Sequence, residues 1–177
     1  MRKLTCAVVL GMLVWTPAFP QAIRSAERSP SLAETYEWLQ SHLEQSVVIP
    51  FVGTRTIHVE SVDHCQIVLT DTWNYSDTTK SPAAWRHLIL IKDLDPEHHR
   101  LEPEEPLDTA IYWSLTIPTR TGRFTIVTCS AQDVKCEGFK ALGGQIDLPF
   151  SEKNVATRTS KALRHAIFLC GGQRSPF

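Results

Sequence analysis

The sequence predicts an α+β fold: mainly an antiparallel sheet, or a partly open barrel, of about six to seven strands flanked by two helices. Apolar residues recur at helical intervals near both ends, over about residues 31–45 and about 151–170. Short segments between them alternate apolar and polar residues, and no period repeats along the chain. Strands gathered between two helices are typical of an antiparallel sheet rather than of alternating βαβ units.

The first helix is predicted to begin after Ser31. Ser31 and Glu34 have the spacing of a capping box, in which each side chain accepts a hydrogen bond from the backbone of the other residue. One apolar stripe follows at helical intervals and consists of Leu32, Tyr36, Leu39 and Leu43. Pro50 and Gly53 interrupt this pattern, so the helix is expected to end before them.

The middle of the chain predicts strands separated by turn residues. The expected strands lie around residues 57–59, 65–69, 88–91, 111–117, 124–128 and 146–150. A tight turn is expected at 62–64 and another at 121–123. The unbroken apolar run at 88–91 is typical of a strand that is covered on both faces.

A second helix is predicted to close the domain. Ser151 is a suitable N-cap, and Glu152 stands where the helix dipole favours a negative charge. The face expected to be buried consists of Val155, Thr159, Ala162, Leu163, Ala166 and Cys170. Gly171 and Gly172 follow this face and predict a helix end with a left-handed cap.

The N-terminus has the order of a secretory signal peptide. Arg2 and Lys3 precede an apolar run at 4–15, and prolines and small residues follow. The run is shorter than the ~20 residues that span a bilayer, although an uncleaved apolar anchor is the alternative. The predicted organisation is a signal peptide at 1–22, a flexible leader at 23–30, a single globular domain at 31–172 and a C-terminal tail at 173–177. We therefore expect a secreted or periplasmic protein with no transmembrane segment in the mature chain.

The composition is that of an ordinary globular domain. The chain has 177 residues, of which 42% are hydrophobic, with 18 Lys and Arg against 19 Asp and Glu. These values exclude collagen-like, coiled-coil and wholly disordered chains. The near-zero net charge argues against nucleic-acid binding, which needs a basic surplus. Removal of residues 1–22 would change the net charge from −1 to −3 and leave four of the five cysteines.

An even number of cysteines in an exported chain favours disulfides. A bond between Cys65 and Cys170 would fasten the last helix to the sheet, and Cys129 and Cys136 could form a local clamp across a polar loop. The alternative is four reduced cysteines that serve as small apolar fillers. No CxxC pair is present, so a zinc site is not expected.

Candidate catalytic and metal-binding motifs are sparse. The sequence contains no nucleophile elbow, no HExxH and no glycine-rich phosphate loop. Residues 93–97 space carboxylates as a calcium loop does, but without its central glycine, so we expect a solvated loop with His98 and His99 exposed in it. No catalytic residue, metal or cofactor is predicted. Dispersed Asp, Glu and His residues could still form an acid–base site, because such sites leave no local signature.

The leading hypothesis is therefore a non-catalytic binding or interaction module for an unknown protein, peptide or envelope ligand. The alternatives are a small hydrolase or metal-assisted enzyme, which a cleft that gathers carboxylates with histidine would favour, and a structural cell-envelope protein. Exposure of Trp73, Tyr75 and Trp85 on one patch would support the structural role. The polar loop expected at 71–82 contains Trp73, Asn74 and Tyr75 and, with Trp85 after it, is the predicted contact surface.

Two segments resemble the ends of small exported bacterial proteins of unassigned function. They are residues 31–39, SLAETYEWL, and the stretch from Leu148-Pro149-Phe150 to Leu169-Cys170-Gly171-Gly172. The strand-rich body closed by one helix also resembles a pleckstrin-homology-type barrel. That family often binds phosphoinositide headgroups through basic residues around its first hairpin, where this chain has Asp63 and His64. The resemblance implies a barrel-like architecture and assigns no catalytic residue.

Overall fold

The structure is a computed structural model that describes residues 29–104, 112–120, 125–133, 135–137 and 140–172. The predicted signal peptide, most of the predicted leader and the predicted tail lie outside these residues. Neither of the described helices is long and apolar enough to cross a membrane.

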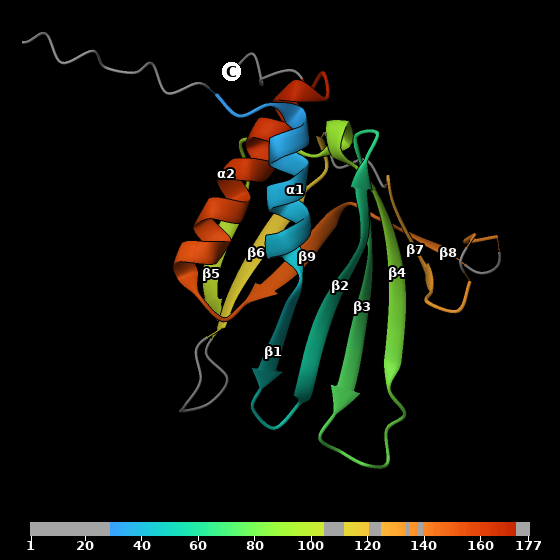
Figure 1. The fold of residues 1–177 in the computed structure, drawn as a ribbon. Coiled ribbons are helices and arrows are strands. Elements are labelled where there is room, and N and C mark those ends of the chain that lie inside the picture. The colour runs from blue at the N-terminus through green and yellow to red at the C-terminus, as the bar shows by residue number, and fades with distance from the viewer. Residues whose placement is uncertain (1–28, 105–111, 121–124, 134, 138–139, 173–177) are drawn as a thin grey trace, which may run out of the picture.

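Two helices and nine strands make up the described chain (Figure 1). In order they are α1 (Leu32–Leu43), β1 (Gln45–Ile49), β2 (Gly53–Asp63), β3 (Gln66–Tyr75), β4 (Ala83–Leu90), a 3-10 turn (Ile91–Asp93), β5 (Arg100–Glu104), β6 (Tyr112–Pro118), β7 (Ile126–Ser130), β8 (Lys140–Gly143), β9 (Gln145–Phe150) and α2 (Lys153–Leu169). The strands form a six-stranded sheet ordered β1-β2-β3-β4-β7-β8 and a three-stranded sheet ordered β5-β6-β9, both antiparallel. The predicted α+β class is confirmed, but the strands number nine and do not close into a barrel.

The start of α1 and the end of α2 lie where the sequence predicts them. The capping box of α1 is confirmed, because the Ser31 amide donates to Glu34 Oε2 at 2.6 Å and the Glu34 amide donates to Ser31 Oγ at 3.3 Å. Helix α2 ends at a left-handed Gly171, with φ of 78°, and the Gly172 amide donates to the carbonyl of Ile167. Its N-cap is Glu152 rather than the predicted Ser151, so α2 begins one residue later than expected.

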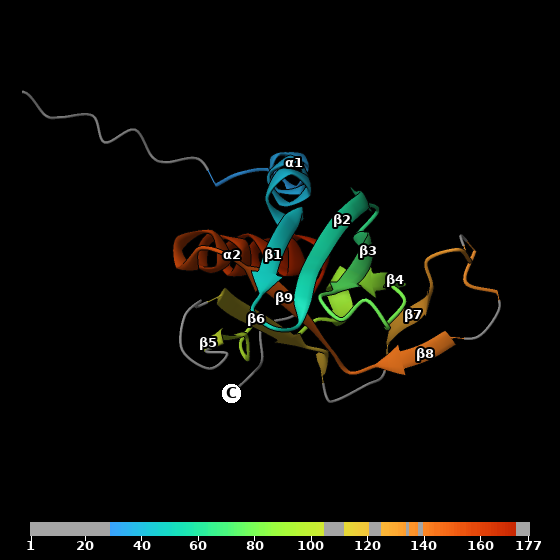
Figure 2. The ribbon, with the colours of Figure 1, turned by 90° about the horizontal axis from the view of Figure 1, so that it is seen from below.

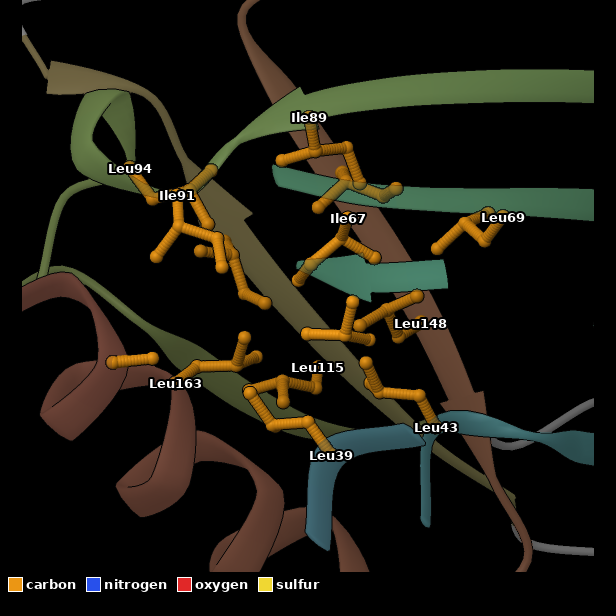
Figure 3. Packing of buried hydrophobic residues seen from close by; sticks show 14 of the residues in the cluster. Leu39, Leu43, Ile67, Leu69, Ile89, Ile91, Leu94, Leu115, Leu148 and Leu163 are labelled. Carbon is orange, nitrogen blue, oxygen red and sulfur yellow. The ribbon is translucent and has the colours of Figure 1, made fainter. Parts of the chain in front are cut away.

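The hydrophobic core lies between the helices and the two sheets (Figure 3). Helices α1 and α2 pack together, and Figure 2 shows them on one side of the three-stranded sheet and against the near end of the six-stranded one. The six-stranded sheet contributes Ile57, Leu69 and Ile89 from one face, which we call the inner face. The strands extend beyond this core, so the far half of the inner face is not covered by the helices (Figure 1).

Three strands, β1, β5 and β8, were not predicted from the sequence, each for a local reason. β1 begins directly after α1, where the helical pattern had been extended to residue 45. β5 contains Pro103 among charged residues and is an edge strand, the position in which a sheet tolerates proline. β8 is short and ends in Gly143. The apolar run at 88–91 is not covered on both faces, because Ile89 is buried whereas Leu90 is exposed.

The turn between β2 and β3 is also shifted from the prediction. Val62 and Asp63 belong to β2, and the turn residues are His64 and Cys65, with φ of 43° and 59°. Positive φ at both central residues is the conformation of a type I′ hairpin, for which Asn-Gly is the usual sequence. Cys65 is therefore in the turn and not on the strand face where the alternation had placed it.

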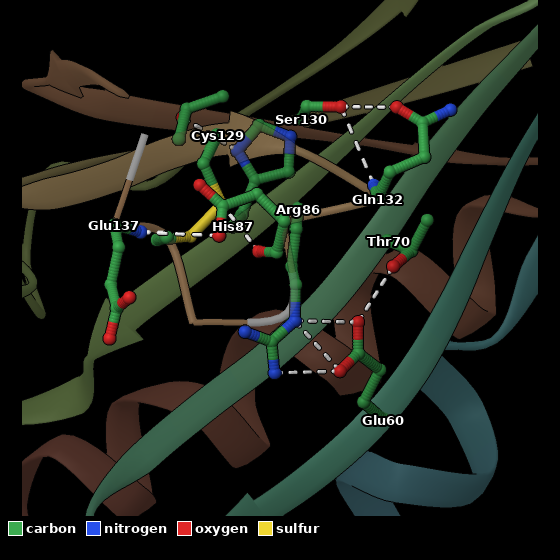
Figure 4. Close-up of a disulfide and its surroundings, with 11 residues drawn as sticks. Glu60, Thr70, Arg86, His87, Cys129, Ser130, Gln132 and Glu137 are labelled. Carbon is green, nitrogen blue, oxygen red and sulfur yellow. Dashed lines mark hydrogen bonds and ion pairs between the residues drawn. A yellow bond between two sulfur atoms is a disulfide. The ribbon is translucent and has the colours of Figure 1, made fainter. Parts of the chain in front are cut away.

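The four described cysteines pair as predicted. Cys65 joins Cys170 at a Cα separation of 5.6 Å, and Cys129 joins Cys136 at 5.5 Å. The first bond fastens the end of α2 to the β2–β3 turn, and the Tyr36 hydroxyl lies 3.3 Å from both of its sulfur atoms. The second bond joins two cysteines with a sequence separation of seven and closes the loop after β7 (Figure 4). Disulfides are compatible with an oxidising compartment.

Candidate functional site

The predicted aromatic residues gather on the half of the inner face that the helices do not cover (Figure 1). Trp73 and Tyr75 occupy alternate positions of β3 and therefore point to one side of the sheet. Trp85 of β4 pairs with Asp71, which lies on the same side. Asn74 falls between the two aromatic positions and points to the opposite side, so it is removed from the predicted contact surface.

A buried ion pair lies beside these rings. Arg55 of β2 donates from Nη2 to Asp71 Oδ2 at 2.7 Å and from Nε to both carboxylate oxygens at 3.1 Å. The side chains are only 14% and 7% exposed. The same Nη2 donates to the Asp147 carbonyl of β9 at 2.7 Å, so Arg55 joins the two sheets. The pair satisfies both charges where burial would otherwise penalise them.

The aromatic rings form a row that ends in a cation at each side. The Arg55 guanidinium carbon lies 5.0 Å from the centre of the Trp73 ring, which stacks on Tyr75 at 6.3 Å. The Lys80 ammonium lies 5.5 Å from the centre of the Tyr75 ring. Such contacts fix ring orientation through the negative face of the π system. Trp85, in the neighbouring strand, is 42% exposed and adds the most accessible ring of the group.

Neutral hydrogen-bonding groups continue the site along β4 and β7. His87 Nδ1 lies 2.9 Å from Thr128 Oγ1 on the strand beside it. Burial lowers the pKa of His87, and the neighbouring Arg55 guanidinium lowers this pKa further against the opposing effect of Asp71. His87 is therefore neutral at pH 7 and offers one donor and one acceptor.

The opposite face of the same strands carries a second ion pair with a structural role. Arg86 donates to Glu60, whose Oε1 also accepts the Thr70 hydroxyl at 2.7 Å (Figure 4). This network ties β2, β3 and β4 together beside the Cys129–Cys136 bond. The hydrogen bond to Arg86 lowers the pKa of Glu60 despite partial burial. Among the described residues of β2, β3 and β4, none on this face is a tryptophan, tyrosine or phenylalanine, in contrast to the inner face.

The predicted solvated loop at 93–97 lies between two regular elements. It begins in the 3-10 turn at Ile91–Asp93, and β5 follows it at residues 100–104. Asp95 Oδ1 accepts the amides of Glu97 and His98, and its Oδ2 lies 2.8 Å from His98 Nδ1. The carboxylate thus organises a local turn.

The expected exposure of His98 and His99 is half right. His98 is exposed, but His99 turns inward and its Nδ1 lies 2.9 Å from Ser160 Oγ of α2. Burial, with a smaller effect from Arg164, lowers the pKa of His99 to about 4. The sequence of this segment does not indicate that His99 packs against α2 while its neighbour His98 stays exposed.

The pKa of His99 predicts a pH-dependent stability. The pKa of His99 is near 6.5 in the unfolded chain and lower in the folded state, so the folded state binds the proton more weakly. The contribution of neutral His99 to the free energy of unfolding is therefore fully present above pH 6.5 and is lost as the pH falls toward 4. We expect His99 to lower the free energy of unfolding by about 2 kcal/mol between pH 7.5 and pH 5. Urea unfolding of wild type and His99→Gln at both values measures this difference. An equal pH dependence in both proteins would refute it, whereas His87 leaves a smaller residual dependence in the variant.

Among the residues that the structure describes, no group of three or more His, Cys, Asp or Glu is placed to hold a metal ion.

Arg55, Asp71 and His87 were not singled out from the sequence. The signal that could have found them is the presence of charged or polar residues at apolar-phase positions of strands, next to Ile57, Leu69 and Ile89.

Comparisons with known proteins give no assignment. No family model matches the chain, and neither a curated protein nor a solved structure matches it.

Proposed function

We propose that the chain is an exported, non-catalytic binding module that takes an uncharged sugar chain of the cell envelope on the inner face of its six-stranded sheet. The observation that carries the proposal is the exposed Trp85 ring beside the Trp73–Tyr75 stack. A large ring exposed next to two partly buried ones is an accessible apolar surface with a polar handle, as binding sites often have.

The charges of the face select the class of ligand. Asp71 neutralises Arg55 directly, and burial keeps His87 neutral. The site therefore offers apolar rings with neutral donors and acceptors. Its one unbalanced cation among the residues described above, Lys80, is exposed at the end of the row beside Tyr75, and the buried charges of the site are paired. The C–H face of a sugar ring fits on an indole, and its hydroxyl groups match neutral hydrogen-bonding partners. The Cys65–Cys170 and Cys129–Cys136 bonds support the exported location.

The structural cell-envelope hypothesis is the second candidate, because it predicts the same grouping of Trp73, Tyr75 and Trp85. The two differ in what occupies the face. A binding module takes soluble sugar fragments with saturation, whereas a purely structural protein does not.

The Trp85→Ala variant tests the binding site. We expect titration of the wild-type chain with a tetramer of N-acetylglucosamine to change tryptophan fluorescence with saturation. Loss of one aromatic platform is expected to weaken binding by roughly fivefold to 150-fold, if a sugar ring gains the about 1–3 kcal/mol that a nucleic-acid base gains on an aromatic side chain. Isothermal titration calorimetry measures the same loss without relying on the removed fluorophore.

Trp38→Ala is the matched control, because Trp38 stacks on His42 in α1 and is not one of the rings of the β3–β4 aromatic group. It is expected to leave the affinity unchanged. Equal binding by Trp85→Ala, or saturable binding only to peptides, would overturn the assignment of a sugar ligand to this face.

A further inference from the structure

The outward face of α2 carries a row of cations. Lys153, Arg158, Lys161 and Arg164 are all exposed, and the helix itself contains no Asp or Glu. At about 100° per residue, the four side chains fall within an arc of about 140° on the side of the helix opposite its buried face. We call these four residues the basic row. Figures 1 and 2 both show α2 on the side of the molecule away from β4 and β7.

The described part of the chain does not neutralise the basic row. None of its four cations forms an ion pair with a carboxylate that the structure describes. The Lys153 ammonium lies 4.7 Å from the centre of the Trp113 ring, and the Arg158 guanidinium carbon lies 5.4 Å from the centre of the Trp38 ring. An aromatic face attracts a cation but leaves its charge in place. The two arginines that pair with carboxylates in the six-stranded sheet are, by contrast, neutralised.

The stability of the helix does not explain this placement of charge. Lys153 is the first residue of α2, where the helix dipole favours an anion rather than a cation. Arg158, Lys161 and Arg164 follow one another at intervals of three residues, at which side chains are neighbours and like charges repel. An anionic partner outside the chain would remove this repulsion.

The length of the basic row defines the kind of anion. At ~1.5 Å per residue, Lys153 and Arg164 are separated by about 17 Å along the helix, so a single small anion cannot contact both ends. Lipid headgroups move laterally and can align with fixed cations, whereas a free polymer loses conformational entropy when it is held straight along the helix. Trp38 and Trp113, which are partly buried beneath the row, are of the residue type that membrane interfaces favour.

We propose that the basic row of α2 binds a membrane surface that contains anionic phospholipids. Each cation is attracted by the negative surface potential, and the row presents all four on one face of a helix. Because β4 and β7 lie on the other side of the molecule, the contact leaves the inner face open to a sugar ligand (Figure 2). The two sites share no residue, so each can be tested without the other.

Co-sedimentation of the purified chain with vesicles tests the proposal. We expect wild type to bind vesicles of phosphatidylcholine and phosphatidylglycerol in equal amounts but not vesicles of phosphatidylcholine alone. Binding is expected to weaken as sodium chloride is raised from about 0.05 M to about 0.5 M, because salt screens the attraction. The Lys153→Gln, Lys161→Gln double variant is expected to bind roughly 25-fold more weakly, since each cation near an anionic surface contributes roughly fivefold. The Lys153→Arg, Lys161→Arg variant keeps both charges and is expected to bind like wild type.

Lys80→Gln, Lys135→Gln is the matched control, because it removes the same charge from exposed positions that follow β3 and β7. It is expected to bind within about twofold of wild type at 0.15 M salt, where charges more than about 8 Å from the membrane are largely screened. Circular dichroism and urea unfolding verify that all variants are folded. Titration of Lys153→Gln, Lys161→Gln with the N-acetylglucosamine tetramer is expected to match wild type, so failure here is distinguished from failure of the sugar site.

Three results would overturn the assignment of a membrane to the basic row. The first is wild-type binding to neither kind of vesicle or to both equally. The second is a loss of binding in the control variant as large as that in Lys153→Gln, Lys161→Gln. The third is binding of soluble polyphosphate without binding of vesicles, which would assign the row to a free polyanion.

Discussion

Simultaneous replacement of Cys65 and Cys170 by serine is expected to lower the free energy of unfolding by about 4–5 kcal/mol. The bond closes a loop with a sequence separation of 105 residues, and a loop of that length loses much conformational entropy in the unfolded chain. It also holds the end of α2 against the left-handed His64–Cys65 turn. Urea unfolding of the oxidised wild type and the double variant measures the difference, and mass spectrometry with and without reduction verifies the bonds.

The Cys129→Ser, Cys136→Ser double variant is the matched control. Its loop is short, with a separation of seven residues, so the same chain-entropy model gives about 2.5 kcal/mol. The long-range bond must therefore contribute more than the local one. If the two double variants were equally destabilised, the bond to α2 would not be the main covalent constraint on this fold.

The second large effect is expected at the buried ion pair of the inner face. Asp71→Ala leaves the Arg55 guanidinium without its carboxylate where both side chains are largely removed from solvent. Loss of one partner of a buried pair typically lowers the free energy of unfolding by about 3–5 kcal/mol. Because Arg55 also stacks on Trp73 and donates to β9, the same variant is expected to disturb the aromatic row. Urea unfolding and near-ultraviolet circular dichroism measure the two effects.

Glu60→Ala provides the comparison on the opposite face of the sheet. Glu60 also pairs with an arginine, but its side chain is 30% exposed, and we expect a cost of about 1 kcal/mol. The Arg55→Met, Asp71→Leu double variant removes both buried charges and is expected to recover most of the lost stability. An Asp71→Ala cost no larger than that of Glu60→Ala would show that burial of the pair does not govern its energetics.

The predictable parts of the fold are those that depend on local signals. The Ser31–Glu34 box and the Gly171 end follow from hydrogen bonds within a few residues, and both are confirmed. β1 and β5 could not be predicted in this way. β1 is a strand because Val47 and Ile49 find a place in the core beside β2, and β5 because β6 accepts it along an edge. These pairings form only when the whole chain folds, so the local sequence of β1 or β5 does not predict them.

The residues of the candidate site also divide into those that the sequence predicts and those that it does not. Trp73, Tyr75 and Trp85 were expected to share a contact surface, and the strand register places them on one face. The error at Asn74 arose because residues 71–75 were predicted to be a loop, which has no alternation of faces. Arg55 and Asp71 are 16 residues apart and come together only through the pairing of β2 with β3. A local sequence pattern therefore does not predict this ion pair.

We expect the inner face to bind an uncharged sugar chain, as proposed above. A two-dimensional nuclear magnetic resonance titration with the N-acetylglucosamine tetramer tests it most directly, because each indole N–H gives its own signal. We expect saturable shifts at Trp85 and Trp73 and none at Trp113, which lies on the other sheet beside Lys153 of α2. Unchanged signals at Trp85 and Trp73 at millimolar sugar, or shifts confined to Trp113, would contradict it.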